Sequence, residues 1–347
     1  MNHNGTRAPL IIPIFISHEG CPHRCLFCNQ SPITGVKELA PAVQASDVKL
    51  EIDKWLTRSP RRGRQIQVAF YGGSFTAISL ERQQELLGAV QPFLRDGRID
   101  FIRLSTRPDY IDAATADFLW GYGVRVVELG IQSMNDETLT ASRRGHTLAQ
   151  SIQALEILTA SKIKTGAQLM IGLPAETTAG ALRGAKHLTR LKPDFARIYP
   201  ALVIKGSGLA ALYEQKKYRP LTLNRTIVLA AKIKNVLAAN GIPVIRIGLP
   251  PSTELAESLI AGPYHPALGE LVAARIFFKR VRKILRQRPA TNHKLIIAAR
   301  DRSIFYGQKK CSLYRLKNLG LLDKVTVIFA NTIRGQIELR ENVESVI

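Results

Sequence analysis

The sequence predicts an α/β fold: a partial (β/α)6, TIM-like barrel followed by a small, basic C-terminal α+β region. From residue 10 to about residue 250, short apolar runs alternate with amphipathic stretches of helical length. Six such strand–helix units predict a parallel sheet with right-handed crossovers. After about residue 265 the alternation gives way to one long basic helix and several short strands. We therefore expect a core domain over residues 1–265 and an accessory region over residues 266–347.

Six apolar runs are the expected strands of the barrel. The first, over residues 10–16, is continuously apolar, as expected for a strand that is buried on both faces. The other five expected strands cover residues 67–71, 99–105, 124–131, 167–172 and 195–199. The expected helices cover residues 79–94, 111–121, 147–161, 177–191 and 223–240.

The C-terminal region shows a different pattern. Residues 266–288 read as a basic helix, with Phe277, Val281 and Leu285 at the spacing of one helix face. The residues beyond it alternate like a small sheet accompanied by a helix. The expected short strands cover residues 294–298, 303–306, 325–330 and 337–339.

Composition narrows the class of protein. With 347 residues and 46% apolar residues, the chain can bury a large core. No apolar run approaches the roughly 18 residues that a membrane span requires. The first seven residues lack the apolar core of a signal peptide. We therefore expect a cytoplasmic protein that does not bind a membrane.

The net charge is +22, and the excess is concentrated near the C-terminus. Residues 275–317 contain 14 lysines or arginines and a single acid, Asp301, which gives this stretch a net charge of +13. A basic patch of this kind attracts polyanions, of which nucleic acid is the first to consider.

Three of the four cysteines lie within eight residues. Cys21, Cys25 and Cys28 have a C-x3-C-x2-C spacing and directly follow the first expected strand. Three thiolates on one loop can hold three irons of a cubane cluster, which leaves the fourth iron without a protein ligand. The carboxyl end of a strand is also where α/β folds place their active sites. The loop therefore indicates chemistry more than architecture.

Other uses of these cysteines remain open at this point. Zinc would need a fourth ligand, which His18 or His23 could supply. Cys311 could complete a four-cysteine site from a distance, although a lone cysteine is more often a small buried side chain. A disulfide framework is disfavoured because the chain is long and poor in cysteine.

With Phe27 as the aromatic residue before the third cysteine, the loop resembles that of the radical S-adenosylmethionine (SAM) superfamily. The resemblance implies a [4Fe-4S] cluster on Cys21, Cys25 and Cys28, with SAM bound at the open iron. It also implies that the core domain over residues 1–265 is a radical SAM barrel. Reductive cleavage of SAM would then give methionine and a 5′-deoxyadenosyl radical, the hard chemistry being supplied by the cofactors.

The resemblance assigns SAM contacts to several further positions. Gly72, Gly73 and Ser74 resemble a Gly-Gly-Glu segment whose backbone meets the SAM amino group, with serine here in place of the acid. Gln132 lies in a Leu-Gly-Ile-Gln-Ser segment like that of the Elongator catalytic subunit and of oxygen-independent coproporphyrinogen oxidase. There the glutamine faces SAM.

Two more positions follow from the same relatives. Arg144 matches an arginine that could meet the SAM carboxylate, although a solvated loop arginine is an alternative. Gln168 occupies a position that resembles a ribose contact and is held by an acid in coproporphyrinogen oxidase. Phe27 completes the set of expected cofactor-binding residues.

Residues 105–110, Ser-Thr-Arg-Pro-Asp-Tyr, resemble an Elongator segment that begins with an acid. Ser105 therefore lacks a charge that the relatives carry, so the reaction of the relatives is not carried over. The C-terminal region also lacks the length and the glycine-rich loop of the acetyltransferase domain of Elongator, and we predict no acetyl transfer. Several residues could line a substrate cavity or serve as structural ion-pair partners: Arg197, Tyr199, Lys205 and Arg246.

The sequence thus favours a radical SAM enzyme that receives electrons from an external donor. The basic C-terminal region and the resemblance favour tRNA or another RNA as the substrate. Two alternatives stay open: a radical SAM enzyme acting on a small molecule such as a tetrapyrrole, and a non-catalytic nucleic-acid or haem-binding protein on the same scaffold. Ser74 and Ser105, at positions where relatives have acids, motivate the non-catalytic alternative.

Overall fold

The computed structural model describes residues 8–16, 19–22, 24–29, 42–287 and 292–341. The chain divides into two compact units, Met1–Thr222 with Ile233–Tyr264 and Leu223–Lys232 with His265–Ile347. We call these the core unit and the C-terminal unit. Within the described ranges, no helix is both long enough and apolar enough to cross a membrane.

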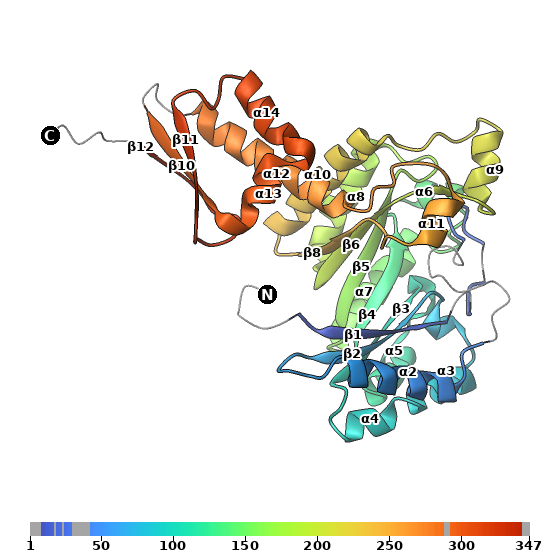
Figure 1. Cartoon of the computed structure of the whole chain (residues 1–347). Helices are drawn as coiled ribbons and strands as arrows, with labels where there is room; N and C mark the ends of the chain where they lie inside the picture. Colours follow the sequence, from blue (N-terminus) through green and yellow to red (C-terminus); the bar gives the residue numbers. More distant parts are fainter. Residues whose placement is uncertain (1–7, 17–18, 23, 30–41, 288–291, 342–347) are drawn as a thin grey trace. The chain divides into compact units, whose positions relative to one another are not determined.

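A curled parallel sheet organises the core unit (Figure 1). Its strands are β1 (Leu10–Phe15), β2 (Ile66–Tyr71), β3 (Phe101–Thr106), β4 (Val124–Gln132), β5 (Lys164–Ile171), β6 (Phe195–Pro200) and β8 (Val244–Ile247). Neighbouring strands follow one another in chain order, and every pair is parallel. The predicted α/β, TIM-like half-barrel is therefore confirmed, with β8 as a seventh strand that the count of six omitted.

Helices connect the strands of the sheet. They are α2 (Ala45–Arg58), α3 (Leu80–Gly88), α4 (Gln91–Arg95), α5 (Ala113–Gly121), α6 (Asp136–Ala141), α7 (Leu148–Ala160), α8 (Thr178–Leu191), α9 (Gly208–Glu214), α10 (Leu223–Ala239) and α11 (Thr253–Ser258). Two short strands, β7 (Val203–Ile204) and β9 (Leu259–Ala261), form an antiparallel pair. The helix expected over 79–94 is divided into α3 and α4, because Pro92 lacks an N–H group for the helical ladder.

Side-chain caps fix where several of these helices begin. Asp112, Asn135, Thr147 and Thr177 each accept a hydrogen bond from the backbone N–H three residues further on. Such caps satisfy N–H groups that have no partner inside the helix. Asn135 and Thr177 are the caps that end the loops after β4 and β5, so they fix the lengths of those two loops.

A buried carboxylate binds together strands from both sides of the sheet. Glu128 on β4 is 3% exposed. Its Oε1 lies 2.5 Å from Nη2 of Arg103 on β3, and its Oε2 lies 2.6 Å from Nε of Arg197 on β6. The hydroxyl of Tyr71 on β2 donates to Oε1 at 2.9 Å. Burial is the largest single effect and lowers the pKa of Arg197, but Glu128, Tyr199 and Tyr71 together raise it above its ordinary value.

We expect Glu128→Ala to destabilise the core unit by about 3–5 kcal/mol, because it leaves two guanidinium groups buried without their counter-ion. Denaturant unfolding followed by circular dichroism measures the change. Asp53→Ala is the matched control, since Asp53 pairs with Arg98 at the surface, with both side chains about half exposed. That change should alter the free energy of unfolding by less than about 1 kcal/mol. Equal effects of the two substitutions would contradict a structural role for the buried carboxylate.

The C-terminal unit contains a long helix and a three-stranded sheet. Its elements are α12 (Leu268–Arg286), β10 (His293–Ala298), α13 (Arg302–Tyr306), α14 (Cys311–Asn318), β11 (Val325–Ala330) and β12 (Ile337–Glu341). β10 lies between β11, which is parallel to it, and β12, which is antiparallel. The predicted face of the long helix is confirmed, since Phe277, Val281 and Leu285 are buried in one apolar cluster.

One predicted strand of this region is wrong. Residues 303–306 belong to α13 rather than to a strand. In so short a run, strand and helix periods cannot be told apart from the sequence. The helix turns Phe305 into the apolar cluster of the C-terminal unit, where it is 2% exposed.

Candidate functional site

The residues predicted to bind cofactors lie on β4 or β5, or in loops that follow the parallel strands of the core unit. The cysteine loop follows β1, and residues 72–74 follow β2. Gln132 is the last residue of β4, Arg144 lies in the connection from β4 to β5, and Gln168 is part of β5. Parallel strands bring their carboxyl ends to one edge, which is where α/β folds bind ligands. The cofactor roles of these residues stay predictions.

The backbone of the cysteine loop is held from two directions. The N–H of Leu26 donates to the carbonyl of Ser142 at 3.1 Å, and the N–H of Leu209 donates to the carbonyl of Leu26 at 2.7 Å. Beyond the third cysteine, the side-chain amide of Asn29 donates to the carbonyl of Lys205 at 2.7 Å. The loop is therefore fixed by both the β4–β5 connection and the segment after β7.

The three cysteines of the loop differ in exposure. Cys25 is buried, Cys28 is half-buried and Cys21 is exposed. Among the described residues, no three His, Cys, Asp or Glu side chains come together as a metal-binding group. Three thiols are suitable in kind as ligands of an iron–sulfur cluster, but the described side chains are not gathered around one metal position. His18 and His23, the candidates for a fourth zinc ligand, lie outside the described residues.

Cys311 does not follow the usual behaviour of a lone cysteine. It is the first residue of α14 in the C-terminal unit and is exposed. The expectation of a small buried side chain is therefore wrong for Cys311.

Arg144 reaches from the β4–β5 connection to the cysteine loop. Its Nη1 lies 3.5 Å from the Sγ of Cys25, and its Nη2 donates to the carbonyl of Gly130 at 2.9 Å. A Cβ atom at Gly130 would come within 2.9 Å of Nη2, so a glycine is what makes room for this guanidinium. Arg144 is buried, which rules out the alternative of a solvated loop arginine.

A second buried arginine positions the first. Arg107, from the Thr-Arg-Pro-Asp segment, is 2% exposed and makes a two-pronged ion pair with Asp109 at 3.0 and 2.7 Å. Its Nη1 donates to the carbonyl of Arg144 at 2.8 Å. Burial, and next the charge of Arg144, lower the pKa of His146 to about 3, so this buried ring stays neutral. The sequence resemblance identified residues 105–110, but it did not reveal this supporting role.

Glycines let the cysteine loop and the loop after β2 approach each other closely. A Cβ atom at Gly73 would lie 2.5 Å from the carbonyl oxygens of Ile16 and Glu19. A Cβ atom at Gly20 would lie 2.3 Å from the carbonyl oxygen of Ser74, and Gly20 has a φ of +70°. The N–H of Ser74 donates to the carbonyl of Glu19 at 3.0 Å across this contact. The glycines therefore have a packing role, whatever ligand the loop binds.

The Ser74 side chain is buried and forms hydrogen bonds within the protein. It is 1% exposed, and its hydroxyl bonds to the Thr106 hydroxyl at 3.1 Å and accepts the N–H of Arg107 at 3.3 Å. The side chain that replaces the acid of the relatives thus ties the loop after β2 to the end of β3. Gly72, with a φ of +93°, provides the turn that precedes it.

We expect Gly73→Ala to destabilise the core unit by about 1–3 kcal/mol, because the new methyl group meets two backbone carbonyls that cannot move independently. Denaturant unfolding measures the change. Gly88→Ala is the matched control, since a Cβ atom at this helical glycine meets nothing within 4 Å. The control should be neutral or stabilising. A neutral Gly73→Ala variant would refute the close approach of the two loops.

Gln132 has an unusual backbone conformation for a residue that is not glycine. Its φ is +66°, and the pairing of β4 with β5 shifts register between Leu129 and Gln132. Its side chain is buried, and its Oε1 accepts a hydrogen bond from Nε2 of Gln168 at 3.3 Å. The structure thus brings together the two glutamines that were predicted to contact SAM. Strained conformations of this kind persist where surrounding structure enforces them, and they cluster at binding sites.

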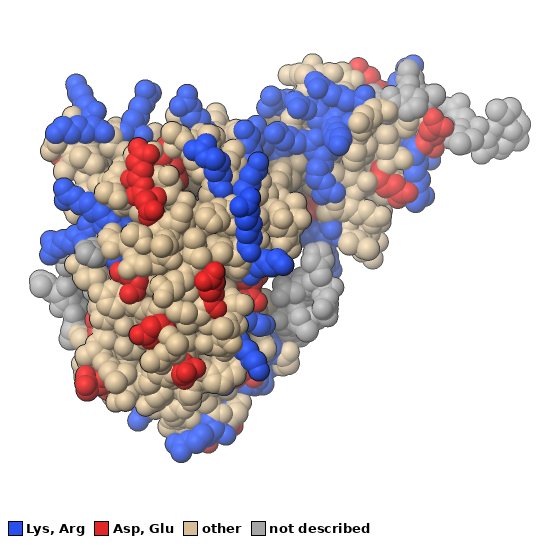
Figure 2. Space-filling view, turned by 180° about the vertical axis from the view of Figure 1, so that it is seen from behind, with Lys and Arg blue, Asp and Glu red and all other residues tan. Residues whose placement is uncertain are grey.

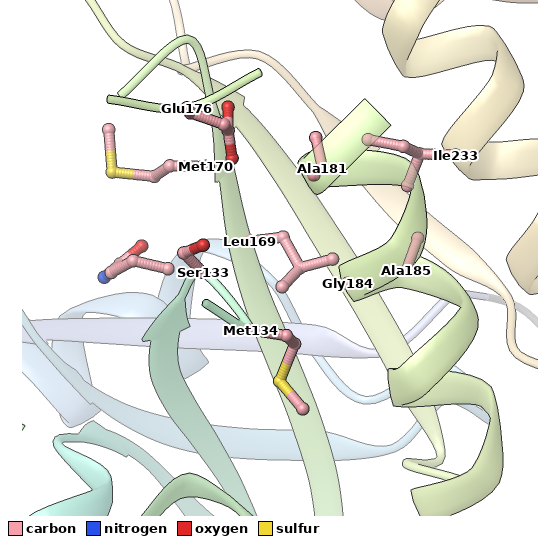
Figure 3. Close-up of a pocket in the computed structure, with 11 residues that line it drawn as sticks. Ser133, Met134, Leu169, Met170, Glu176, Ala181, Gly184, Ala185 and Ile233 are labelled. Atoms are coloured by element: carbon pink, nitrogen blue, oxygen red, sulfur yellow. The ribbon is translucent and has the colours of Figure 1, made fainter. Parts of the chain in front are cut away.

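A small pocket adjoins Gln132 (Figure 3). Its cavity volume of about 10 Å³ is far below the range of about 300–1,000 Å³ that is usual for ligand sites. The figure shows Leu169 and Met170 of β5 on one side of the space and Ala181 of α8 on the other. Glu176, from the loop after β5, stands at one end.

Glu176 holds the loop after β5. Its Oε2 accepts the N–H of Gly172 at 2.6 Å, and the Tyr218 hydroxyl donates to the carbonyl of the same glycine at 2.6 Å. Burial raises the pKa of Glu176 to about 7, although the backbone N–H groups of Gly172 and Leu173 oppose this shift. Folding therefore disfavours the ionised carboxylate.

A raised acid pKa predicts a specific pH dependence. The stability that the protonated Glu176 provides is full below its unfolded pKa of about 4.5 and is lost as pH rises towards 7. We expect Glu176→Gln, which keeps an acceptor but does not ionise, to remove about 1–3 kcal/mol of this pH-dependent loss. Denaturant unfolding of both proteins at pH 5 and pH 8 measures it. An unchanged pH dependence in the variant would show that Glu176 ionises normally.

Phe27, the remaining predicted contact, is partly buried against an apolar cluster. The cluster contains Leu26, Leu173, Ala201 and Leu209. A Cβ atom at Gly208 would lie 2.6 Å from a methyl group of Leu26, so this packing is tight. Phe27 therefore packs the cysteine loop against β5 and α9.

The sequence analysis did not predict the buried ion cluster around Glu128. Glu128, Arg103 and Tyr71 were not singled out, and Arg197 was left open between a cavity lining and an ion-pair partner. The structure assigns Arg197 as an ion-pair partner of Glu128. The signal was present as single charged residues inside otherwise apolar strands, because a charge there needs a buried partner. Tyr199 receives a hydrogen bond from Arg197 at 3.3 Å, while Lys205 is exposed and Arg246 donates to the carbonyl of Gly248.

Comparison with known families identifies the class of this fold and site. Residues 15–181 match the radical SAM superfamily, and residues 193–277 match the radical SAM C-terminal domain. The chain belongs to the radical SAM superfamily.

The chain is similar to proteins of the Elongator type. It is 24% identical over 263 residues to the tRNA uridine(34) acetyltransferase of Methanocaldococcus jannaschii, covering 65% of this chain and 49% of the relative. It is 29% identical over 221 residues to an uncharacterised protein of the same organism, covering 60% of this chain and 66% of the relative. The chain thus spans between about half and two thirds of the length of these relatives.

A solved structure supports the same fold. The Elongator protein Elp3 of Methanocaldococcus infernus, with an N-terminal deletion, superposes with a TM-score of 0.59 at 21% identity. The match covers 80% of this chain and 64% of that one. At this level of identity the likeness concerns the fold alone.

Proposed function

We propose that this radical SAM protein binds a [4Fe-4S] cluster through Cys21, Cys25 and Cys28 and cleaves SAM reductively. One observation carries the proposal: the three-cysteine loop is fixed at the carboxyl edge of the barrel, with the Arg144 guanidinium 3.5 Å from the Cys25 sulfur. A bound cluster would supply the electron that cleaves the C5′–S bond of SAM, leaving methionine and a 5′-deoxyadenosyl radical. The electron must come from an external donor, whose identity is open.

Residues of this chain would hold SAM beside that loop. The backbone at Gly72, Gly73 and Ser74 lies directly against the cysteine loop, which supports its assignment to the SAM amino group. Gln132 and Gln168 are hydrogen-bonded to each other near the same sheet edge. Arg144 would neutralise negative charge close to the cluster, and Phe27 would pack beneath the loop.

We propose tRNA as the substrate. The support is the similarity to a tRNA uridine(34) acetyltransferase and the net charge of +22, which favours a polyanion. Acetyl transfer is not part of the proposal, because the similarity covers only part of that relative. A cytoplasmic location stays a prediction of the sequence.

The test is anaerobic reconstitution with iron and sulfide, followed by dithionite and SAM, with 5′-deoxyadenosine as the measured product. We expect the wild-type chain to form it and Cys25→Ala to reduce it to background, because the cluster loses one of its three ligands. Cys311→Ala is the matched control and should leave the product unchanged, since Cys311 lies in the other unit.

Three outcomes would each contradict a different part of the proposal. A reconstituted cluster with no deoxyadenosine, with or without tRNA, would sink the enzymatic proposal and favour a binding protein on this scaffold. One zinc per chain and no iron, measured by elemental analysis, would replace the cluster with a zinc site. Deoxyadenosine formed without any mass change in tRNA nucleosides would retain the chemistry and reject the substrate.

A further inference from the structure

The C-terminal unit contains a group of arginines that form no ion pair with an acid among its described residues. Lys and Arg side chains crowd one face of this unit at the upper right of Figure 2, with few acidic ones among them. Within its described residues, the ion pairs join Arg334 with Asp301 and Arg340 with Glu338. Neither of these two ion pairs involves a basic residue of α12 or α14.

Two of these arginines lie beside one aromatic ring, and a third lies close enough to interact with both of their charges. Arg275 and Arg282 lie seven residues apart on α12, two turns of one helix face, and Arg315 comes from α14. The guanidinium carbon of Arg315 lies 5.2 Å from the ring centroid of Phe278, and that of Arg282 lies 5.9 Å from it. Phe278 is 7% exposed and belongs to the apolar core of the unit, so the ring is a fixed platform. We call Arg275, Arg282 and Arg315 the arginine cluster.

The cluster is electrostatically unfavourable without an anion. The pKa of Arg275 is lowered by burial first and then by the charges of Arg315 and Arg282. The Nε atom of Arg275 is buried and has no hydrogen-bond partner among the described residues. Like charges held together by the fold, with an unused buried donor, are the arrangement that an incoming anion stabilises.

We propose that the arginine cluster is a binding site for phosphate groups of an RNA backbone. This inference rests on the proposed function, because it names how the C-terminal unit would hold the RNA substrate. Guanidinium groups bind phosphate oxygens with two parallel hydrogen bonds, and the ring of Phe278 orients two of them in advance. The surrounding stretch of residues 275–317, with its net charge of +13, would attract the rest of a polyanion. Tyr314, next to Arg315 and 54% exposed, is available to stack on a base.

The test compares two triple variants of the full chain that remove the same charge. The first is Arg275→Gln, Arg282→Gln and Arg315→Gln. The control is Arg280→Gln, Lys294→Gln and Arg300→Gln, three exposed residues of the same unit outside the cluster. Binding of unmodified tRNA is measured by fluorescence anisotropy across a range of salt concentrations, and circular dichroism checks that both variants stay folded.

We expect the cluster variant to lose at least about tenfold in affinity at moderate salt. Its plot of log affinity against log salt should flatten by about two to three, as each lost phosphate contact removes roughly 0.7–0.9 from the slope. The control should change the slope by less than about one. Should the cluster variant unfold, the single variants Arg282→Gln and Arg315→Gln replace it, each with an expected slope change of about one.

Two results would overturn the proposal. Equal losses in both triple variants would mean that RNA responds to the overall charge and not to this cluster. Salt-independent tRNA binding, or none, would remove RNA as the ligand. Formation of 5′-deoxyadenosine is measured without RNA, so a failure here leaves the radical SAM chemistry to be judged by its own assay.

Discussion

The core unit depends on one buried carboxylate. Glu128 stands on the central strand β4 and receives donors from β2, β3 and β6, so a single side chain links β6 to β2 and β3, with which β6 does not pair. In a low-dielectric interior, the three side chains that donate to Glu128 interact with it strongly. We infer that these interactions stabilise the curvature of the sheet. The hydrophobic face of each strand provides the driving force, but the ion cluster defines which strands face one another across the barrel.

The same logic of a buried charge extends to the cofactor edge. Asp109 holds Arg107, Arg107 holds the backbone of Arg144, and Arg144 reaches the sulfur of Cys25. Each link is a charged group with little exposure, so loosening one leaves the next without its partner. The position of the cysteine loop is thereby set by the segments that follow β3 and β4. Residues 105–110 are thus important for the site without any need to touch a cofactor.

Most of the architecture could be predicted because it follows from local patterns. Apolar runs predicted the strands of the barrel, and amphipathic stretches predicted the helices between them. The seventh strand was missed because Val244–Ile247 is short and partly exposed. Residues 303–306 were misassigned because their alternation is too brief to separate two periods. The cysteine loop was found because its spacing is rare, whereas the links from Arg107 to Arg144 and from Glu128 to Arg197 join distant positions that no local pattern connects.

The two serines that depart from the relatives have different physical consequences. Ser74 is buried between Thr106 and the backbone of Arg107, and no cation is among its bonded partners. An acid in that place would be a buried charge without compensation, so the serine suits this packing. Ser105, on β3, is only partly buried. Arg144 is a buried cation beside the cysteine loop, and neither serine adds a negative charge near it.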